Sequence, residues 1–336
     1  MKIRTIDWKK NRIKIIDQTK LPGEFRYVYI KNVRQLFDAI KSMKIRGAPA
    51  LAAAGALGVV LAAHRSRAKN GRQLKRGLEQ VIRYLGSSRP TAVNLFWALD
   101  RMRKAVDDNK NDSPARIKSA LLKEATDIME EDRLACRKMA EIGSRLIKDG
   151  DRILTVCNAG MLATIDYGTA LGVIYKAKEK GRKFKVYACE TRPLFQGARL
   201  TAWELKKSGI DVTLICDSLA ATLMRKKQIT KVLAGADRIA LNGDAANKVG
   251  TYNLAVLADW HGIPFYIVAP LSTFDPAIKT GKDIPIEERP ALEVTHNFFK
   301  RPIAPSGIKV LNPAFDVTPR RLITAIITEK GILKTR

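Results

Sequence analysis

Five short apolar stretches decide the fold of the second half of the chain: ILTVC at 153–157, KVYAC at 185–189, DVTLIC at 211–216, KVLAGA at 231–236 and PFYIV at 264–268. Each stretch is apolar nearly throughout instead of alternating, which is typical of parallel strands that helices cover on both faces. Segments with helical composition follow the first four stretches, at about 162–180, 202–209, 219–227 and 249–260. Repeated βα units at this spacing predict an α/β fold with a doubly wound parallel sheet.

Polar and reactive side chains stand at the ends of these predicted strands. A doubly wound sheet binds its ligands at the carboxyl ends of its strands. Those ends carry Cys157-Asn158, Cys189-Glu190-Thr191-Arg192, Cys216-Asp217 and Asp237-Arg238. The sequence therefore predicts a functional site at this edge of the sheet.

The first half of the chain is more helical. Helices are expected at about 32–43, 50–63, 74–85, 92–106 and 114–147, and a small sheet near 3–17. We expect a smaller, mainly helical N-terminal domain with a small sheet at residues 1–130. A Rossmann-like α/β catalytic domain is expected at residues 131–336, with the long charged helix near residue 130 as the connector.

The charge is strongly positive, because 61 Lys and Arg residues face 33 Asp and Glu residues, for a net charge of +28. These cations are spread over predicted helices and turns, and no recognised nucleic-acid module accompanies them, so a basic solvated surface is favoured over specific nucleic-acid binding. The first ten residues lack the apolar run of a signal peptide. The longest apolar stretch, 51–63, is shorter than the ~20 residues of a membrane span. We expect a cytoplasmic protein with no membrane partner.

The sequence motifs narrow the chemistry. The chain has no GxGxxG after a strand, no GxxxxGK[ST], no GxSxG and no HExxH, and it contains three histidines. None of its four cysteines forms a CxxC pair, which argues against a zinc site and against a secreted disulfide scaffold. Proton transfer, if the chain is an enzyme, therefore falls to carboxylates or a cysteine.

Two residues are the candidates for that chemistry. Cys157 ends the first strand before Asn158-Ala159-Gly160, a turn where backbone N–H groups and a helix start favour an anion. A buried cysteine that acts only as a small apolar side chain is the alternative. Asp237 follows a buried strand, where desolvation favours a general acid or base. Pairing with the adjacent Arg238 is the alternative for this carboxylate.

Other segments have the composition of phosphate sites. Arg46-Gly47-Ala48-Pro49 precedes a helix of small residues, and an arginine at a helix start suits a phosphate. A helix-entry turn is the alternative. Arg89 stands in a loop, and Asn247-Lys248 puts an amide and an ammonium group before the predicted helix at 249–260. A helix cap is the alternative for the latter pair.

At these residues the sequence resembles the 5-methylthioribose-1-phosphate isomerase family, aldose–ketose isomerases of methionine salvage. The matching segments run nearly end to end: IDQTKLP at 16–22, IRGAPA at 45–50, RPTAVNLFWAL at 89–99, CNAGMLATIDYGTALGVI at 157–174, ETRPLFQGARLTAWEL at 190–205, AGADRIALNGDAANKVGTY at 234–252, HGIPFY at 261–266, IPIEER at 284–289 and NPAFDVTP at 312–319.

The resemblance implies the roles of particular residues. The family's catalytic pair falls on Cys157 and Asp237. Its substrate-binding positions fall on Arg46, Gly47, Ala48, Arg89, Gln196, Asn247 and Lys248. It also implies a homodimer of Rossmann-like subunits, a small sugar phosphate as substrate, and no metal or nucleotide cofactor.

One departure from the family pattern concerns Cys189. In the family, an Asp commonly occupies this position, just before Glu190. The absence of that carboxylate at the rim of the site is expected to alter either the substrate preference or only a structural hydrogen bond. Three alternatives stay open: an isomerase of ribose 1,5-bisphosphate, an isomerase of 5-deoxyribose 1-phosphate, and a non-catalytic regulatory subunit of the translation initiation factor 2B type. Such subunits generally lack the cysteine and the aspartate.

Overall fold

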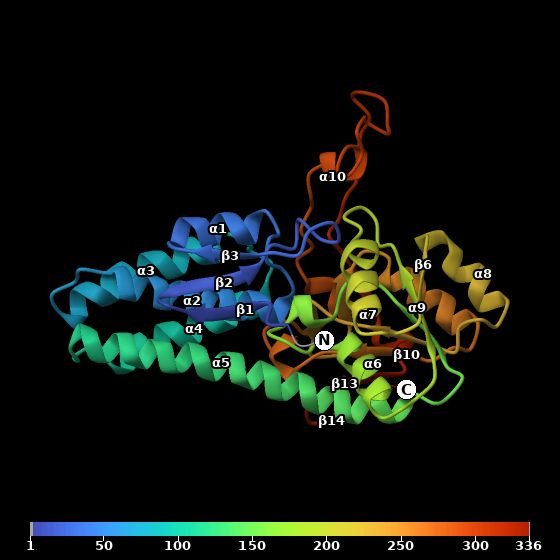
Figure 1. Ribbon diagram of the computed structural model, residues 1–336, viewed down its shortest axis with the longest axis horizontal. Helices are drawn as coiled ribbons and strands as arrows, with labels where there is room; N and C mark the ends of the chain where they lie inside the picture. The colour runs from blue at the N-terminus through green and yellow to red at the C-terminus, as the bar shows by residue number, and fades with distance from the viewer. Residues whose placement is uncertain (1–2, 336) are drawn as a thin grey trace. The chain divides into compact units, whose positions relative to one another are not determined.

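A computed structural model describes residues 3–335 and separates the chain into two compact units (Figure 1). The first unit comprises Met1–Arg137 together with Gly160–Gly168. The second comprises Lys138–Ala159 and Thr169–Arg336. The helix α5 (Pro114–Gly143) contains the point at which the first unit ends, and the predicted boundary near residue 130 falls within the same helix.

The second unit is built on a seven-stranded sheet in the order β14-β13-β10-β7-β4-β5-β6. All neighbours pair in parallel except β13 and β14, which are antiparallel. The strands are β4 (Arg152–Thr155), β5 (Lys185–Cys189), β6 (Val212–Ile215), β7 (Lys231–Ala234), β10 (Phe265–Val268), β13 (Ala325–Thr328) and β14 (Gly331–Lys334). The five predicted strands and the α/β doubly wound fold are confirmed.

The sheet contains a reversal of strand order beside β4. From β4 the chain steps outward to β5 and β6, then returns to lie on the other side of β4 as β7 and continues to β10. Such a reversal is a topological switch point, where the connections on the two sides leave toward opposite faces and open a crevice. The gap between the ends of β4 and β7 is therefore where this fold is built to hold a ligand.

Helices cover the sheet. They are α6 (Ala170–Glu179), α7 (Ala202–Lys207), α8 (Ala220–Arg225) and α9 (Thr251–Trp260). Leu223 of α8 and Leu254 of α9 share a buried apolar cluster with Leu154 and Val232 of the sheet. Figure 1 shows α6 and α7 in front of β10 and β13. A short helix, α10 (Leu292–Thr295), lies in an arm at residues 290–312 that projects from this unit (Figure 1).

A second, four-stranded sheet in this unit was not predicted. Its order is β11-β8-β9-β12, with strands β8 (Arg238–Ala240), β9 (Ala245–Lys248), β11 (Phe274–Asp275) and β12 (Phe315–Thr318). The strands have two to four residues each, so they carry no periodicity that a sequence could display. The crossover after β7 therefore includes an antiparallel β8–β9 pair before α9 begins.

The predicted helix at 162–180 is wrong in its first part, since α6 begins only at Ala170. The preceding residues, 160–168, belong to the first unit, where the Thr5 amide donates to the Ile165 carbonyl (2.8 Å) and the Thr5 hydroxyl donates to the Met161 carbonyl (2.7 Å). Backbone groups that a helix would have paired are satisfied by another part of the chain.

The first unit packs helices against a small antiparallel sheet. Its strands are β1 (Ile6–Lys9), β2 (Arg12–Ile16) and β3 (Tyr27–Ile30), and its remaining helices are α1 (Val33–Lys41), α2 (Ala48–Arg65), α3 (Gly71–Gly86) and α4 (Val93–Asp108). The helix α2 is long and apolar enough to cross a membrane, but it is mostly buried, as the core helix of a globular unit is. Gly55 brings α2 close to Leu95 of α4.

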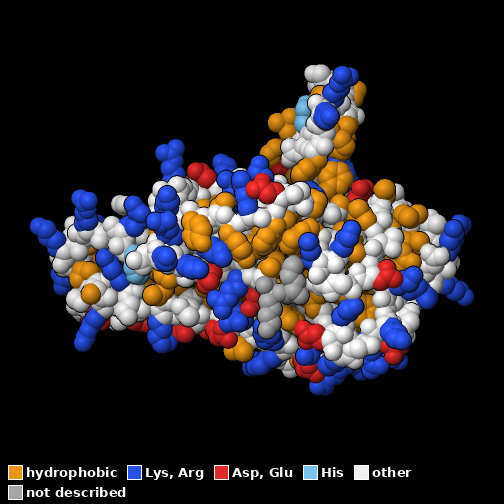
Figure 2. Space-filling view, viewed as in Figure 1, with side chains coloured by type: hydrophobic (Ala, Val, Ile, Leu, Met, Phe, Trp, Pro, Cys, Tyr) orange, Lys and Arg blue, Asp and Glu red, His pale blue; other side chains and the backbone are white. Residues whose placement is uncertain are grey.

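The basic residues do not form one stripe on the face that Figure 2 shows. Figure 2 shows Lys and Arg side chains distributed over the visible surface of both units, with Asp and Glu between them. Many of the cations form ion pairs with carboxylates, for example Arg101 with Glu124 and Arg133 with Asp166. This distribution is typical of a solvated charged surface.

Candidate active site

Cys157 and Asp237 follow the two strands that flank the switch point. The strands β4 and β7 are parallel neighbours with Thr155 opposite Leu233. Cys157 comes two residues after Thr155, and Asp237 comes four residues after Leu233, so both leave the sheet at the same edge. Each of the two residues is partly buried. The sequence-based placement of both residues at the carboxyl ends of buried strands is confirmed.

The backbone of Cys157 has a strained conformation, with φ = 60°. A non-glycine residue in this left-handed region costs about 1–2 kcal/mol, so the surrounding structure must hold it. Two threonines do so: the Cys157 amide donates to the Thr191 hydroxyl at 2.8 Å, and the Thr201 hydroxyl donates to the Cys157 carbonyl at 2.6 Å. Thr191 belongs to the strand-end group Cys189-Glu190-Thr191-Arg192 that the sequence places at this edge, whereas Thr201 was not singled out.

The loop after β5 is itself held by Asp217 at the end of β6. The carboxylate of Asp217 accepts hydrogen bonds from the amides of Thr191 and Arg192, each at 2.8 Å. Thr191 is also left-handed, with φ = 65°. Two links thus connect three strand ends: Asp217 after β6 holds Thr191 after β5, and Thr191 holds Cys157 after β4.

Gln196 lies in the same loop and is almost fully buried, at 4% exposure. Its side-chain oxygen has no hydrogen-bond partner among residues 3–335. A buried amide oxygen without a partner is uncommon, and a ligand hydroxyl is one group that satisfies it. The loop is tightly packed here, because a Cβ on the adjacent Gly197 would lie 1.6 Å from the Cys189 carbonyl oxygen.

A buried carboxylate anchors the residue after Cys157. The Asn158 amide donates to Glu204 at 2.8 Å and to the Thr201 hydroxyl at 3.1 Å. The Tyr175 hydroxyl donates to the other Glu204 oxygen at 2.9 Å. Glu204 is fully buried, so this network fixes the turn that carries the thiol.

Asp237 lies immediately before β8, and Asn247 and Lys248 lie on the adjacent strand β9 of the smaller sheet. The Asp237 amide donates to the Ala246 carbonyl at 2.9 Å, and Arg238 stands opposite Ala246 in the β8–β9 register. Asn247 and Lys248 are therefore strand residues of β9, and the helix-cap interpretation of this pair is wrong. The neighbouring Arg238 forms an ion pair with Asp275 at 3.4 Å.

The side chains of Asn247 and Lys248 are buried and oriented by hydrogen bonds. Asn247 donates to the Thr251 hydroxyl at 2.9 Å, and the Lys248 ammonium donates to the Ala314 carbonyl at 2.7 Å. The ammonium also lies 4.9 Å from the centre of the Phe315 ring. A buried ammonium held in this way places a positive charge beside the end of β9.

Asp316 is a neighbour of this pair that the sequence analysis missed. It stands opposite Asn247 in the β9–β12 register, and its carboxylate accepts the amides of Gly250 (2.6 Å) and Tyr252 (3.1 Å). Burial raises the pKa of Asp316 to about 6, although these amides and the Lys248 charge oppose the rise. Asp316 thereby fixes the turn between Lys248 and α9.

The remaining predicted residues lie in the first unit. Gly47 is the N-cap of α2, with φ = 93°, and makes no side-chain hydrogen bond to the first N–H groups of the helix. Ala48 begins α2, and the buried Arg46 donates through Nε to Gln18 at 3.1 Å. Arg89 is partly buried in the loop between α3 and α4.

Residues 160–168 pack against the segment that holds Arg46 and Gly47. A Cβ at Gly47 would lie 2.5 Å from the Ala163 backbone, and Gln18 donates to the Leu162 carbonyl at 2.7 Å. Gln18 thus contacts both Arg46 and the chain that leaves the Cys157 turn. Within the first unit, this places the predicted phosphate-binding turn beside a segment that begins three residues after Cys157.

The other cysteines have different surroundings. Cys189 is buried in the core of the second unit and not on the rim of a site, and burial raises the pKa of its thiol. An ionised Asp at this place would be costly to bury, whereas a thiol packs as a small apolar group. Cys136 is buried and Cys216 is exposed, and all four cysteines are free. Residues 3–335 hold no cluster of three His, Cys, Asp or Glu side chains arranged for a metal.

Comparison with known proteins gives consistent matches along the chain. The model of the Initiation factor 2 subunit family matches residues 44–335. A curated protein of Moorella thermoacetica named 5-deoxyribose 1-phosphate isomerase is 52% identical, covering 99% of this chain and 94% of that protein. One of Geotalea daltonii named methylthioribose-1-phosphate isomerase is also 52% identical, covering 99% and 96%.

Solved structures are similar over the same length. The 5-methylthioribose 1-phosphate isomerase of Pyrococcus horikoshii is 45% identical with a TM-score of 0.91, covering 98% of this chain and 92% of that one. A structure from A. fulgidus described as subunit delta of translation initiation factor eIF-2B is 49% identical with a TM-score of 0.87, covering 99% and 96%. Proteins named as isomerases and proteins named as initiation factor subunits therefore both occur among similar chains.

Proposed function

Because this chain belongs to the Initiation factor 2 subunit family, whose similar members include sugar-phosphate isomerases, we propose that it converts 5-methylthioribose 1-phosphate into 5-methylthioribulose 1-phosphate. The single observation that carries this proposal is the arrangement at the switch point. A thiol and a carboxyl group leave neighbouring parallel strands at the edge where this fold binds ligands. The role in methionine salvage, the cytoplasmic location and the homodimer belong to the same proposal.

The reaction moves one hydrogen between neighbouring carbons. A phosphate on C1 blocks spontaneous opening of the furanose ring, so the enzyme must break the bond between C1 and the ring oxygen. Asp237 serves as the general acid that protonates this oxygen. The hydrogen on C2 is then delivered to C1 while the C2 hydroxyl loses its proton and becomes the ketone, so that substrate and product have the same atoms. A general acid of this kind contributes ~10²–10⁴-fold in rate.

Cys157 assists the transfer from C2 to C1. Two routes fit: a proton that leaves and returns through an enediol, and a hydride that moves directly between the carbons. The held conformation of Cys157 supports a fixed position for its thiol against the substrate. Carrying out the reaction in D₂O separates the routes, because only the proton route incorporates solvent deuterium at C1 of the ketose.

The substrate's phosphate is assigned to cationic and amide groups. Arg46, Gly47, Ala48 and Arg89 from the first unit, with Gln196, Asn247 and Lys248 from the second, are proposed as substrate-binding residues. The start of α2 and the buried ammonium of Lys248 support an anion-binding role. The partnerless oxygen of Gln196 supports a role in binding a sugar hydroxyl.

The test is ketose formation by purified protein. Methylthioribose 1-phosphate, 5-deoxyribose 1-phosphate and ribose 1,5-bisphosphate should be compared by kcat/KM under one set of conditions. We expect the first to be preferred. Cys157→Ser and Asp237→Asn should each lower kcat by at least ~10² while circular dichroism stays unchanged. Near-normal turnover by either variant would reject the assignment of that residue.

Two alternatives follow from the comparisons. The 52% identity with a protein named 5-deoxyribose 1-phosphate isomerase favours that substrate as the second candidate, which the same assay resolves. The likeness to an initiation factor subunit favours a regulatory role. Turnover of none of the three sugar phosphates, with RNA retained on a filter at moderate salt, would support the regulatory role, because nonspecific charge binding weakens steeply as salt rises.

A further inference from the structure

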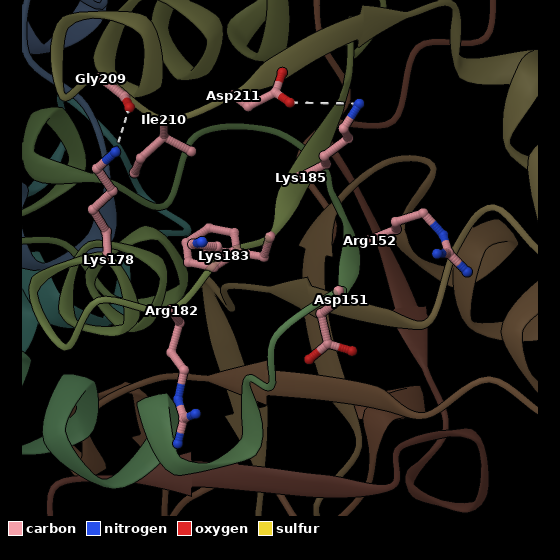
Figure 3. A pocket seen from close by; sticks show the side chains of 11 residues that line it. Asp151, Arg152, Lys178, Arg182, Lys183, Lys185, Gly209, Ile210 and Asp211 are labelled. Carbon is pink, nitrogen blue, oxygen red and sulfur yellow. Dashed lines mark hydrogen bonds and ion pairs between the residues drawn. The ribbon is translucent and has the colours of Figure 1, made fainter.

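A cavity of about 530 Å³ lies at the amino-terminal edge of the main sheet in the second unit (Figure 3). Its lining comes from the approaches to three successive strands, at 150–152 before and into β4, 182–185 before and into β5, and 209–211 before β6, with Lys178 of α6. The proposed catalytic groups follow the opposite, carboxyl ends of these strands. The cavity is therefore separate from the candidate active site, and its volume is within the range of small-molecule sites.

Cationic side chains outnumber carboxylates around this cavity. The cations are Arg152, Lys178, Arg182, Lys183 and Lys185, and the carboxylates are Asp151 and Asp211. Figure 3 shows Lys178, Arg182, Lys185 and Arg152 on different sides of the cavity. A concave surface with an excess of one charge focuses the electrostatic potential and raises the local concentration of the opposite ion.

The two lining carboxylates cancel little of this excess, although Asp149, outside the lining, pairs with Arg182 at 3.5 Å. The Asp151 carboxylate is paired with the ammonium of Lys231 at 2.5 Å, and it also accepts the Lys148 amide at 2.6 Å and the Thr230 hydroxyl at 2.8 Å. Lys231 does not line the cavity, so it neutralises Asp151 without using any of the five lining cations. Asp211 pairs with Lys185 at 3.6 Å, but both side chains are more than half exposed, so this contact is weak and easily exchanged.

Stabilisation of a helix end explains only some of these cations. Lys178 lies near the C-terminus of α6 and donates to the Gly209 carbonyl at 2.7 Å, as a cation at a helix end commonly does. Arg152 begins β4 and donates to the Lys227 carbonyl, just past the end of α8, at 2.9 Å, so it also stabilises a helix end. Lys185 begins β5 and does not lie at the end of a helix. Its contribution to the same cavity therefore needs another explanation.

The backbone leaves room for a ligand at two points. Gly150 and Gly209 both have positive φ, at 81° and 68°, and a Cβ added to either would have no neighbouring atom within 4 Å. Phe184 and Ile210 add apolar lining beside the cations. The cavity thus combines open space, apolar side chains and several cations.

We propose that this cavity binds a small phosphorylated anion, at a site distinct from the one that holds the isomerase substrate. Guanidinium and ammonium groups from different elements recognise phosphate oxygens by charge-assisted hydrogen bonds. The proposal does not depend on the proposed function, because its residues lie outside the candidate active site and the binding of pyrophosphate is measured without turnover.

Inorganic pyrophosphate is the probe for this site. Its binding should be measured by titration calorimetry at constant ionic strength with the full-length protein. The double variant Arg182→Glu, Lys183→Glu reverses two exposed lining cations. Its matched control, Lys300→Glu, Arg301→Glu, makes the same change of charge in the arm, which contributes no lining residue. We expect the first variant to bind pyrophosphate at least about tenfold more weakly and the control to stay within about twofold.

Two further measurements make the outcome decisive. Both variants should keep their circular dichroism spectra and their turnover of the sugar phosphate, since none of the four side chains is assigned to the catalytic site. Pyrophosphate should remain bound when the sugar phosphate saturates the protein. The proposal is overturned if the wild-type protein binds no pyrophosphate at millimolar concentration, if both variants weaken binding equally, or if the sugar phosphate displaces all of it.

Discussion

The Cys157 amide donates a hydrogen bond to the Thr191 hydroxyl at 2.8 Å, which ties the turn after β4 to the loop after β5. On the other side of the same residue, the Thr201 hydroxyl holds the Cys157 carbonyl. The two threonine hydroxyls hold the backbone of Cys157 in its left-handed conformation. This fixed backbone restricts the directions in which the thiol can point.

Thr201→Val should therefore impair catalysis more than folding. It removes the hydroxyl that holds Cys157 and keeps nearly the same volume, so we expect kcat to fall about tenfold or more and the free energy of unfolding to fall by about 1 kcal/mol. Steady-state kinetics and urea unfolding measure both. The matched control is Thr126→Val on α5, whose hydroxyl bonds only to the Leu122 carbonyl of its own helix. Equal kcat in the two variants would contradict the role of Thr201.

Glu204→Gln should destabilise the second unit. Both Glu204 oxygens accept hydrogen bonds in the wild type, one from the Asn158 amide and one from the Tyr175 hydroxyl. A glutamine of the same shape places an NH₂ group against one of these donors, leaving buried polar groups unmatched at a cost of about 1–3 kcal/mol. Urea unfolding should show a lower midpoint, with Tyr175→Phe as the milder comparison. An unchanged midpoint for Glu204→Gln would mean that this network contributes nothing to stability.

Gly47→Ala should disrupt the start of α2. Gly47 has φ = 93°, and its added Cβ would lie 2.5 Å from the backbone of Ala163, so residues 160–168 would have to shift. We expect a loss of stability above 1 kcal/mol and a large rise in KM. Gly77→Ala is the control, because its Cβ meets nothing within 4 Å in the middle of α3 and should raise stability by up to ~1 kcal/mol. Thermal unfolding and kinetics of both variants test this difference.

Asp132→Asn should change how stability depends on pH. Asp132 accepts the Ile165 amide at 3.0 Å, and the Cys136 thiol lies 3.6 Å from its other oxygen. Burial raises the pKa of Asp132 to about 7, and these two hydrogen bonds only partly oppose that rise. The folded protein therefore keeps this proton up to about pH 7, whereas the unfolded chain loses it near pH 4.

The stabilisation from that proton is complete below about pH 4 and is lost as the pH rises to about 7. The asparagine variant lacks this titration, so its free energy of unfolding relative to wild type should rise between pH 5 and pH 8. Urea unfolding at both pH values provides the comparison, with Asp38→Asn on the exposed surface of α1 as the control. A constant difference between Asp132→Asn and wild type across this range would contradict the prediction.

Much of the main sheet could be predicted because buried parallel strands are apolar along their whole length. ILTVC at 153–157 and KVLAGA at 231–236 can be recognised as strands for this reason. Because neighbouring parallel strands end at the same edge of the sheet, Cys157 and Asp237 can then be placed at that edge. The smaller sheet could not be predicted in the same way. Its strand β8 has three residues, and its pairing with β9 depends on a turn that includes the left-handed Gly243.

The strand ends include Thr191 and Asp217, but the contacts by which these residues and Thr201 support the candidate site were beyond sequence reasoning for a different reason. Thr201 lies 44 residues from the Cys157 carbonyl that it holds, and Asp217 lies 26 residues from the Thr191 amide. No local sequence pattern shows that a threonine will bond to a distant backbone group. The end of a strand, by contrast, is visible in the sequence as the end of an apolar run. Contacts of this kind become visible only when the loops after β4, β5 and β6 are seen side by side.

The return of residues 160–168 to the first unit has a consequence for dissecting the protein. The chain passes between the units three times, within α5, after Ala159 and after Gly168. A fragment ending at Arg137 would lack the nine residues that accept hydrogen bonds from Thr5 and Gln18 and enclose Gly47. No uninterrupted piece of chain contains the whole of one unit and nothing of the other, and Cys157 lies two residues before the crossing after Ala159.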